Sequence, residues 1–208
     1  MSRYTEAKCR LCRREGAKLF LKGEKCSSVK CILEKRKTAP GQHGITRVRF
    51  SEYRLRLREK QKARRIYGIS ETQFRNYFEL ASKRKGVTGE TLLQLLERRL
   101  DNVLYRLGFA ASRSQARQLI AHGHVLVNGK KLDIPSYLVK PGDRIALKGK
   151  IMSGDLGETL KERVTEVRLP SWLEVNSDQL EGMVRSLPSR QEIDIPVNEQ
   201  LIVEFYSR

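Results

Sequence analysis

The chain has 208 residues, of which 39% are hydrophobic, enough for one large domain or two small ones with modest cores. Its 42 Lys and Arg outnumber 24 Asp and Glu, and the formal charge of +18 predicts a polyanionic partner. The sequence has no apolar run long enough to span a membrane, and its first residues lack the apolar stretch of a secretory signal. We therefore expect a cytoplasmic protein, with no membrane partner and with reduced thiols.

The positive charge is concentrated at the N-terminal end. Residues 1–70 hold 21 basic and 6 acidic groups, a net charge of +15, whereas residues 151–208 hold 6 and 11, a net charge of −5. A single charged cluster is usually a solvated surface. An excess of fifteen positive charges within the first seventy residues is too large for that interpretation and favours an N-terminal region that binds a polyanion.

Residues 1–50 contain all four cysteines, as a C-x2-C pair and a C-x4-C pair: Cys9, Cys12, Cys26 and Cys31. Two such pairs supply four thiolates, the shell of a structural zinc site, and neighbouring basic residues favour the deprotonated sulfurs. Four thiolates also suit an iron–sulfur cluster. Two disulfides or four unrelated thiols are the alternatives, which a reducing cytosol disfavours.

Three helices are expected next. Residues 51–67 are good helix formers that stop at Gly68, and a capping box at Ser70 opens a helix ending near Gly86. A third helix is expected over residues 88–107, where leucine and valine recur on one stripe and Gly108 follows. We assign that stripe to the core.

A second capping box at Ser112 predicts a short helix to His122, after which the apolar period changes from helical to alternating. Asn128-Gly129 predicts a type I′ hairpin, and residues 145–147 a further short strand. Residues 150–168 show no clear period. In the tail we expect a short helix near residues 177–187 and a final strand over residues 201–206.

On the helix that begins after Ser112, Arg113 and Arg117 are four residues apart and therefore share one face. Planar guanidinium groups suit phosphate oxygens, and Lys130 and Lys131 at the hairpin tip add a second basic edge. A rigid basic surface of this kind is suited to folded RNA, which exposes phosphates and 2′-hydroxyls.

Several longer motifs identify a family. The sequence closely resembles the family of bacterial protein four of the small ribosomal subunit, in its four-cysteine, metal-binding form. The motifs that carry the resemblance occur in order over essentially the whole chain: PGQHG at 40–44, RRIYGI at 64–69, RLDNV at 99–103, YRLGF at 105–109, PVNEQL at 196–201 and EFY at 204–206.

The resemblance implies an α+β fold with a metal-stabilised basic N-terminal segment at 1–50 and a helical domain at 51–94. A small helix-plus-sheet RNA-binding module at 95–169 is inserted into the helical domain, which the C-terminal tail at 170–208 rejoins and completes. It further implies a structural protein rather than an enzyme, holding one structural zinc ion, or an iron–sulfur cluster as the alternative.

As function, the resemblance implies early binding to the 5′ domain of small-subunit ribosomal RNA, which nucleates assembly of the subunit body. It also implies a position beside neighbouring ribosomal proteins where messenger RNA enters, with an effect on translational accuracy. The RNA-binding residues expected from the resemblance and the basic clusters are Gln42, His43, Arg47, Arg49, Lys62, Arg64, Arg65, Arg113, Gln115, Arg117, Gln118, Asn128, Lys130 and Lys131.

Two other functions compete. The same module accompanies pseudouridine synthases, and Arg99-Leu100-Asp101 resembles their catalytic aspartate motif, but only 58 residues follow Lys150, too few for such a catalytic domain. A DNA-binding zinc protein is disfavoured because no recognition helix follows the second cysteine pair as in C2H2 fingers. Competition between structured RNA and duplex DNA would separate the two kinds of nucleic-acid binder.

Overall fold

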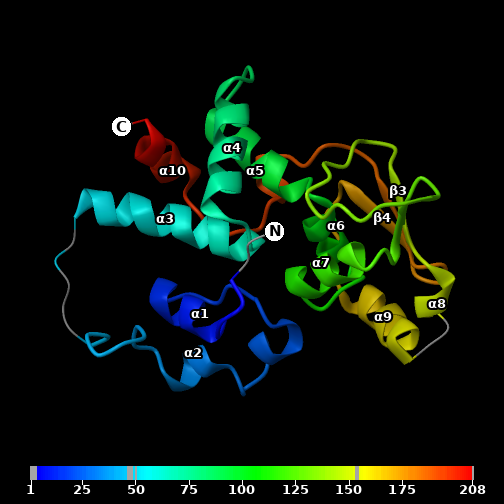
Figure 1. Ribbon diagram of the computed structural model, residues 1–208, viewed down its shortest axis with the longest axis horizontal. Coiled ribbons are helices and arrows are strands. Elements are labelled where there is room, and N and C mark those ends of the chain that lie inside the picture. Colours follow the sequence, from blue (N-terminus) through cyan, green and yellow to red (C-terminus); the bar gives the residue numbers. More distant parts are fainter. Residues whose placement is uncertain (1–3, 46–48, 50, 153–154, 208) are drawn as a thin grey trace. The chain divides into compact units, whose positions relative to one another are not determined.

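The computed structural model describes residues 4–45, 49, 51–152 and 155–207. The chain divides into two compact units, and Figure 1 shows the elements of both. The first unit comprises Met1–Leu92 and Ile195–Arg208, and the second unit comprises Leu93–Asp194. The boundary falls within α5 (Thr88–Glu97), and the second unit is an insertion in the sequence of the first.

The N-terminal segment, residues 4–45, contains three short helical elements: α1 (Cys9–Glu15), the 3-10 helix η1 (Gly23–Cys26) and α2 (Ile32–Lys35). Its buried apolar groups are Leu19, Cys12 and Cys26. Arg13 joins the two ends of the segment, because its Nε donates to the carbonyl oxygen of Thr38 at 2.8 Å. The segment thus has little apolar core and depends on polar contacts.

Two helices of the first unit begin where the sequence predicts. α3 (Glu52–Tyr67) starts after Ser51, whose Oγ accepts from the backbone nitrogen of Arg54 at 3.3 Å. It ends at Gly68, whose φ of 64° lies in the left-handed region that favours glycine. α4 (Glu71–Ser82) is capped by Ser70 in the same way and ends before the predicted Gly86.

The C-terminal segment is a helix, and the strand predicted over residues 201–206 is wrong. α10 (Glu199–Tyr206) begins after Asn198, whose side chain accepts from the backbone nitrogen of Gln200 at 3.0 Å. It lies alongside α3 (Figure 1) and buries Ile202 completely. The run of branched residues favours a strand locally, but the cap and the packing against α3 select the helix.

The single helix predicted over residues 88–107 is two helices, α5 and α6 (Leu100–Arg106). The backbone is extended at Arg99, which bridges to Leu138, and the backbone nitrogen of Leu100 donates to the carbonyl oxygen of Tyr137 at 2.8 Å. The apolar stripe is nevertheless core, as predicted: 0% of the surface is exposed for Leu92, Leu93, Leu96, Leu100, Val103, Leu104 and Leu107.

The predicted hairpin is present. α7 (Arg113–Ala121) leads into β1 (Val125–Val127) and β2 (Lys130–Lys131). Asn128 and Gly129 have φ values of 51° and 77°, as a type I′ turn requires. The predicted strand at residues 145–147 is β3 (Arg144–Leu147), antiparallel to β1.

The tail forms part of this sheet, contrary to the helix predicted near residues 177–187. β4 (Leu173–Asn176) and β5 (Glu181–Val184) are antiparallel neighbours, and the five-stranded order is β2-β1-β3-β5-β4. The assignment of 170–208 to the helical domain therefore differs from the structure, which places 170–194, including the 3-10 helix η2 (Arg190–Glu192), in the second unit. Backbone pairing between β3 and β5 is the reason.

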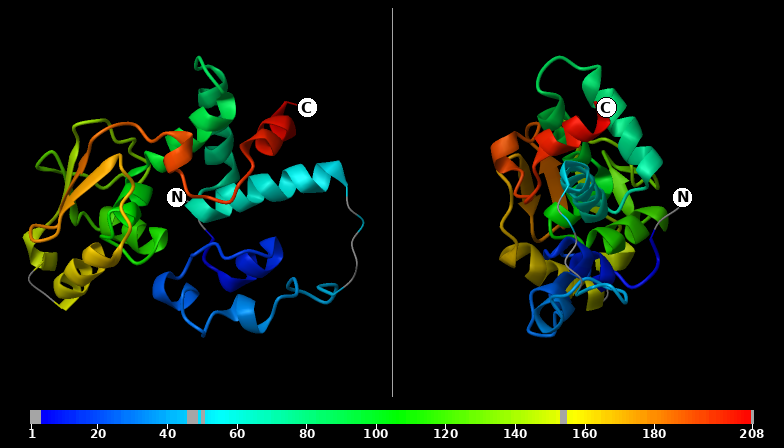
Figure 2. Two further views of the ribbon diagram at one scale, coloured as in Figure 1. Left: turned by 180° about the vertical axis from the view of Figure 1, so that it is seen from behind. Right: turned by 90° about the vertical axis from the view of Figure 1, so that its left-hand side faces the viewer.

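Residues 150–168, for which the sequence showed no clear period, contribute to the short α8 (Gly149–Met152) and to α9 (Asp155–Glu166). One face of the sheet, which carries Val125, Ile145 and Val184, packs in one hydrophobic core with α6, α7 and α9. Figure 2 shows the second unit from two further sides. In β5, a Cβ at Gly182 would lie 2.5 Å from Cδ1 of the buried Leu107, so any larger residue there would force the Leu107 side chain to move.

Candidate nucleic-acid interface

The four cysteines come from α1, from η1 and from the residue before α2, and all are free thiols. Cys12 and Cys26 are buried. Burial raises the pKa of Cys12, and the charges of Cys26, Cys9 and Cys31 raise it further. A hydrogen bond from the backbone of Leu19 acts in the other direction and lowers this pKa. All three thiols therefore lie near Cys12. Within the described part of the chain, however, no group of three or more His, Cys, Asp or Glu is arranged to hold a metal ion.

Glu15 joins the N-terminal segment to α3. Its side chain is 1% exposed, and its Oε1 contacts Nη1 of Arg65 and, at 3.4 Å, Nη1 of Arg58. Burial raises the pKa of Glu15 more than the two cations lower it, and burial also lowers the pKa of Arg65. Sequence reasoning missed Glu15; an acidic residue within a strongly basic segment was the available signal.

The other two cations predicted on α3 are also ion-paired. Lys62 Nζ contacts Glu59 Oε1 at 2.5 Å and the carbonyl oxygen of Pro196 at 3.1 Å. Arg64 Nη1 lies 3.5 Å from Glu71 Oε2. With Arg65 held by Glu15, all three predicted cations of this helix are engaged within the protein.

Arg113 and Arg117 share one face of α7, and that face is turned toward α6. Arg113 donates from Nε to Oδ1 of Asn102 at 2.7 Å and lies over the ring of Tyr105, 4.5 Å from its centroid. Arg117 Nη2 lies 3.2 Å from Asp101 Oδ2, and the Arg117 side chain is 13% exposed. Both guanidinium groups are thus half-buried and engaged with residues of α6.

Two buried acids organise this region. Asp101 also accepts from Arg99, whose Nη2 lies 2.8 Å from Oδ2 and whose side chain is 0% exposed. Glu97 accepts from Asn102 Nδ2 at 2.7 Å and pairs with Arg106 at 3.0 Å. Buried charges are stable only when paired and hydrogen-bonded, and this network provides both.

Of the polar residues predicted to bind RNA, Gln115 and Asn128 make hydrogen bonds within the protein, whereas Gln118 does not lie inside. Gln115 accepts from the backbone nitrogen of Ala111 at 2.7 Å, so its amide stabilises the start of α7. The Asn128 side chain donates to Asp143 Oδ1 and accepts from the backbone nitrogen of Arg144, both at 2.9 Å, and so stabilises the hairpin turn. Gln118, by contrast, is exposed.

The predicted side chains that face solvent are Gln42, His43, Arg49, Gln118, Lys130 and Lys131, together with part of Asn128. Arg47 lies outside the described residues. Lys130 and Lys131 form β2 at the hairpin tip, where both are exposed. The hairpin therefore presents two adjacent cations to a partner.

Further exposed cations were missed as site residues. In residues 4–45, eight Lys or Arg side chains are exposed against three Glu side chains. The eight are Arg10, Arg14, Lys22, Lys25, Lys30, Lys35, Arg36 and Lys37. A second exposed group, Lys83, Arg84 and Lys85, follows α4. Three consecutive basic residues after a predicted helix were the sequence signal that could have identified this second group.

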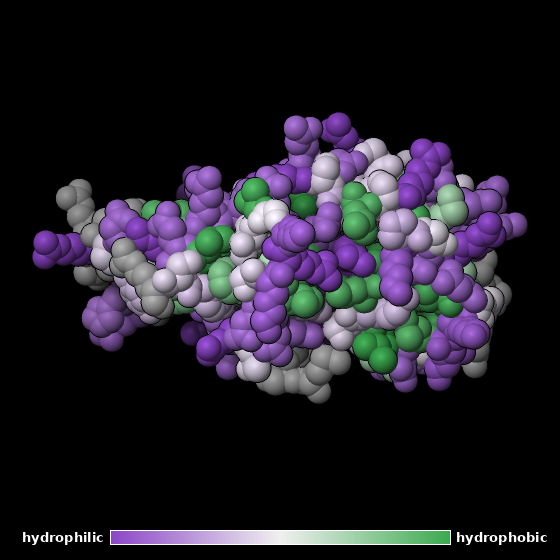
Figure 3. Space-filling model, turned by 90° about the horizontal axis from the view of Figure 1, so that it is seen from above, coloured by the Kyte–Doolittle hydropathy of each residue, from purple (hydrophilic) through white to green (hydrophobic). Residues whose placement is uncertain are grey.

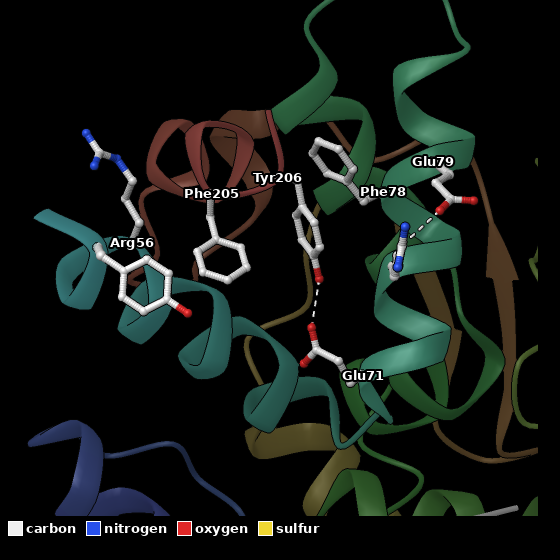
Figure 4. A pocket seen from close by; sticks show the side chains of 8 residues that line it. Arg56, Glu71, Phe78, Glu79, Phe205 and Tyr206 are labelled. Atoms are coloured by element: carbon white, nitrogen blue, oxygen red, sulfur yellow. Dashed lines mark hydrogen bonds and ion pairs between the residues drawn. The ribbon is translucent and has the colours of Figure 1, made fainter. Parts of the chain in front are cut away.

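An aromatic pocket of about 650 Å³ lies in the first unit, between α3, α4 and α10 (Figure 4). Phe205 and Tyr206 enter it from α10, and Phe78 stacks on Tyr206 with ring centroids 4.5 Å apart. The Tyr206 hydroxyl donates to Glu71 Oε1 at 3.0 Å. Tyr53 lines the pocket and is 61% exposed.

Figure 3 shows a face dominated by hydrophilic side chains, with smaller hydrophobic areas between them. Among the residues that the structure describes, no helix is both long and apolar enough to cross a membrane.

The helices α6 and α7, the hairpin and the start of β3 match the family model described as "S4 domain" over residues 98–145, which makes this an S4-domain protein. Residues 3–97 match the model described as "Ribosomal protein S4/S9 N-terminal domain". The proteins named "Small ribosomal subunit protein uS4" of Acetivibrio thermocellus and Pelotomaculum thermopropionicum are each 59% identical over 208 residues, covering 100% of both chains.

The uS4 protein of Thermodesulfovibrio yellowstonii is likewise 59% identical over 211 residues, again over 100% of both chains. This chain belongs to the uS4 family of small ribosomal subunit proteins. The family consists of structural proteins of the ribosome, not enzymes, which confirms the prediction that the chain is not a catalyst.

Proposed function

We propose that this protein is a structural component of the small ribosomal subunit that binds ribosomal RNA and helps to nucleate assembly of the subunit body. The observation that carries the proposal is the excess of eight exposed cations over three exposed acids in residues 4–45. Phosphate neutralisation by such a surface contributes most of the sequence-independent affinity for nucleic acid. Membership of the uS4 family supports RNA, in the small subunit, as the polyanion.

Lys130 and Lys131 provide a second cationic contact. Both are exposed on β2, and the type I′ turn beside them is fixed by the hydrogen bonds of Asn128. A rigid cationic hairpin loses little conformational entropy when it binds. We therefore assign direct phosphate contact to these lysines, and an internal, positioning role to Arg113, Gln115, Arg117 and Asn128.

The test is a binding titration of the full chain against a transcript of the 5′ domain of small-subunit rRNA. Lys130→Ala with Lys131→Ala should weaken binding and reduce the slope of log affinity against log salt by about 0.7–0.9 for each phosphate that is no longer neutralised. Glu162→Gln, on the exposed acidic surface of α9, is the matched control and should leave both unchanged. Equal affinity of the wild type for duplex DNA would contradict the RNA assignment.

We further propose that Cys9, Cys12, Cys26 and Cys31 hold one structural zinc ion, with an iron–sulfur cluster as the alternative. Four thiols of which three lie near Cys12 are a suitable donor set. Two backbone groups already donate to the sulfurs: Leu19 to Cys12, and Lys22 to Cys26 with a nitrogen–sulfur distance of 3.3 Å. Such bonds orient metal ligands and lower the charge on the sulfur.

Elemental analysis of the native protein should find one equivalent of zinc, or iron with a brown chromophore. The double variant Cys9→Ser, Cys12→Ser should release the metal and make residues 4–45 sensitive to protease, while the helices from α3 onward and the sheet stay folded. Disulfides in protein isolated without oxidation, or a metal content that the double variant retains, would contradict a four-cysteine site.

We also propose that the protein lies beside neighbouring small-subunit proteins near the site where messenger RNA enters, and contributes to translational accuracy. The resemblance to the family supports this position. The aromatic pocket supports a protein neighbour, because exposed aromatic groups beside charged pairs are typical of protein interfaces. Tyr53→Ala should preserve rRNA binding and weaken recruitment of a neighbouring protein in stepwise reconstitution; unchanged recruitment would contradict this role for the pocket.

A further inference from the structure

Phe20 is an aromatic residue that the N-terminal segment exposes to solvent. Its side chain is 45% exposed, and its φ of 49° lies in the left-handed region, which costs a non-glycine residue energy. Among the described residues, the most exposed aromatic side chains are those of Tyr4, Phe20 and Tyr53. Tyr53 lines the aromatic pocket and Tyr4 lies near the chain terminus, so Phe20 is the one in the interior of the basic segment.

Hydrogen bonds to two of the cysteines hold the backbone on both sides of Phe20. On one side of it, Leu19 is 2% exposed and its backbone N–H donates to the Cys12 sulfur. On the other side, the backbone nitrogen of Lys22 donates to the Cys26 sulfur at 3.3 Å. Because the chain is held at both positions, the ring of Phe20 is kept outside the small core that Leu19 occupies.

Cations flank the exposed ring along the chain. Lys22 and Lys25 are exposed, and both belong to the same turn and η1 helix that carry Cys26. Lys18 precedes the buried Leu19 and is paired with Glu34. An exposed apolar ring with solvent-facing lysines two and five residues further along the chain is a combination with which proteins bind unpaired nucleotides.

We propose that Phe20 is a stacking platform for an unpaired base of small-subunit rRNA, with Lys22 and Lys25 against the adjoining phosphates. The proposal rests on the proposed rRNA-binding function and gives the N-terminal segment a contact that depends on the face of a base and not on charge. In this proposal the cysteine cluster also positions the Phe20 ring, because the Cys12 and Cys26 sulfurs accept the hydrogen bonds that hold the backbone on either side of it. The strained backbone at Phe20 is consistent with a functional position.

The first experiment compares rRNA affinities of full-length variants. Phe20→Ala should weaken binding to the 5′-domain transcript about tenfold, the usual effect of removing one base–aromatic stack, and should leave the salt slope unchanged because a phenyl ring neutralises no phosphate. Phe20→Tyr should retain the affinity. Val29→Ala is the matched control, since Val29 is 85% exposed in the same segment but cannot stack.

The second experiment uses fluorescence. The chain has one tryptophan, Trp172, which is 1% exposed in the second unit and gives a constant background. In Phe20→Trp the new indole should be quenched when the transcript saturates the protein, whereas the indole of Val29→Trp should not. Far-UV circular dichroism and metal content should match the wild type in each variant.

The outcomes separate this inference from the function on which it rests. Wild-type affinity in Phe20→Ala, or an unquenched indole in Phe20→Trp at saturation, overturns the stacking proposal while rRNA binding itself stands. Absence of binding by the wild type overturns the proposed function and the stacking contact together. Weaker binding by Phe20→Ala accompanied by a reduced salt slope would show a disturbed cationic surface and also counts against stacking.

Discussion

At the residue scale, Arg117 is a structural group and not the free cation that its place in the sequence indicates. Its Nη2 lies 3.2 Å from Asp101, which is itself buried and also pairs with Arg99. Removing one partner from a buried ion pair leaves the other charge poorly compensated in a medium of low dielectric constant. The cost should therefore appear in the stability of the second unit before it appears in RNA affinity.

We predict that Arg117→Ala lowers the free energy of unfolding of the second unit by about 2 kcal/mol. Urea unfolding followed by the fluorescence of Trp172, which lies in this unit, measures the effect. Gln118→Ala, at the exposed neighbouring position, should be close to neutral. Unchanged stability together with weaker RNA binding would instead make Arg117 a direct phosphate ligand.

At the element scale, α10 is attached to α3 and α4 by charged and aromatic contacts. Arg56 Nε on α3 lies 2.5 Å from Glu204 Oε2 on α10, and Glu71 on α4 accepts from both Lys60 and Tyr206. Burial and the Glu71 charge raise the pKa of Tyr206, so its hydroxyl stays a donor. Burial alone would raise the pKa of Glu71, but the hydrogen bonds from Lys60 and Tyr206 outweigh it and lower the pKa.

A lowered pKa in the folded state sets the direction of a pH effect. Glu71 is ionised more readily when folded, so its contribution to stability is complete above its unfolded pKa and is lost as pH falls through its folded pKa. We predict that the wild type loses stability of the first unit between about pH 5 and pH 3, and that Glu71→Gln loses less over that window. Thermal unfolding followed by circular dichroism at each pH measures the difference.

The control for this effect is Glu79→Gln. Glu79 lies on the same helix and pairs with Arg75 at 3.1 Å, but both side chains are more than half exposed. An exposed pair contributes little to stability, so this variant should keep the acid dependence of the wild type. Identical pH profiles for Glu71→Gln and the wild type would show that the attachment of α10 does not depend on this carboxylate.

At the scale of the whole molecule, two units with separate cores share one chain. The core of the second unit, with Trp172 in it, is closed within Leu93–Asp194. The first unit needs its C-terminal segment, because Asn198 donates from its backbone nitrogen to Glu59 at 3.1 Å and α10 packs on α3. The C-terminal segment is therefore part of the folded structure of the first unit.

We predict that deletion of residues 195–208 destabilises the first unit selectively. Protease sites in α3 and α4 should open and helical circular dichroism should fall, while the urea midpoint reported by Trp172 stays within error of the wild type. The isolated segment 93–194 should give the same midpoint. Joint unfolding of both units would show that they fold as one cooperative body.

Signals confined to a few residues were read correctly from the sequence. The predicted caps at Ser70 and Ser112 each accept from a backbone nitrogen three residues away, and Asn128 and Gly129 form the predicted turn with positive φ at both residues. The apolar period of residues 92–107 identified core side chains even though it ran across a break in the helix. The family motifs likewise identified the class of protein.

What the sequence by itself determined was local geometry, side-chain burial along periodic stretches, and the sign and position of charge. Only the tertiary structure decided the partners: that residues 201–206 form a helix on α3, that β4 and β5 extend the sheet, and that Arg113 and Arg117 turn inward. The physical reason is that a branched apolar run or an arginine has several favourable environments. Contacts with residues distant in sequence select among them, and those contacts exist only in the folded chain.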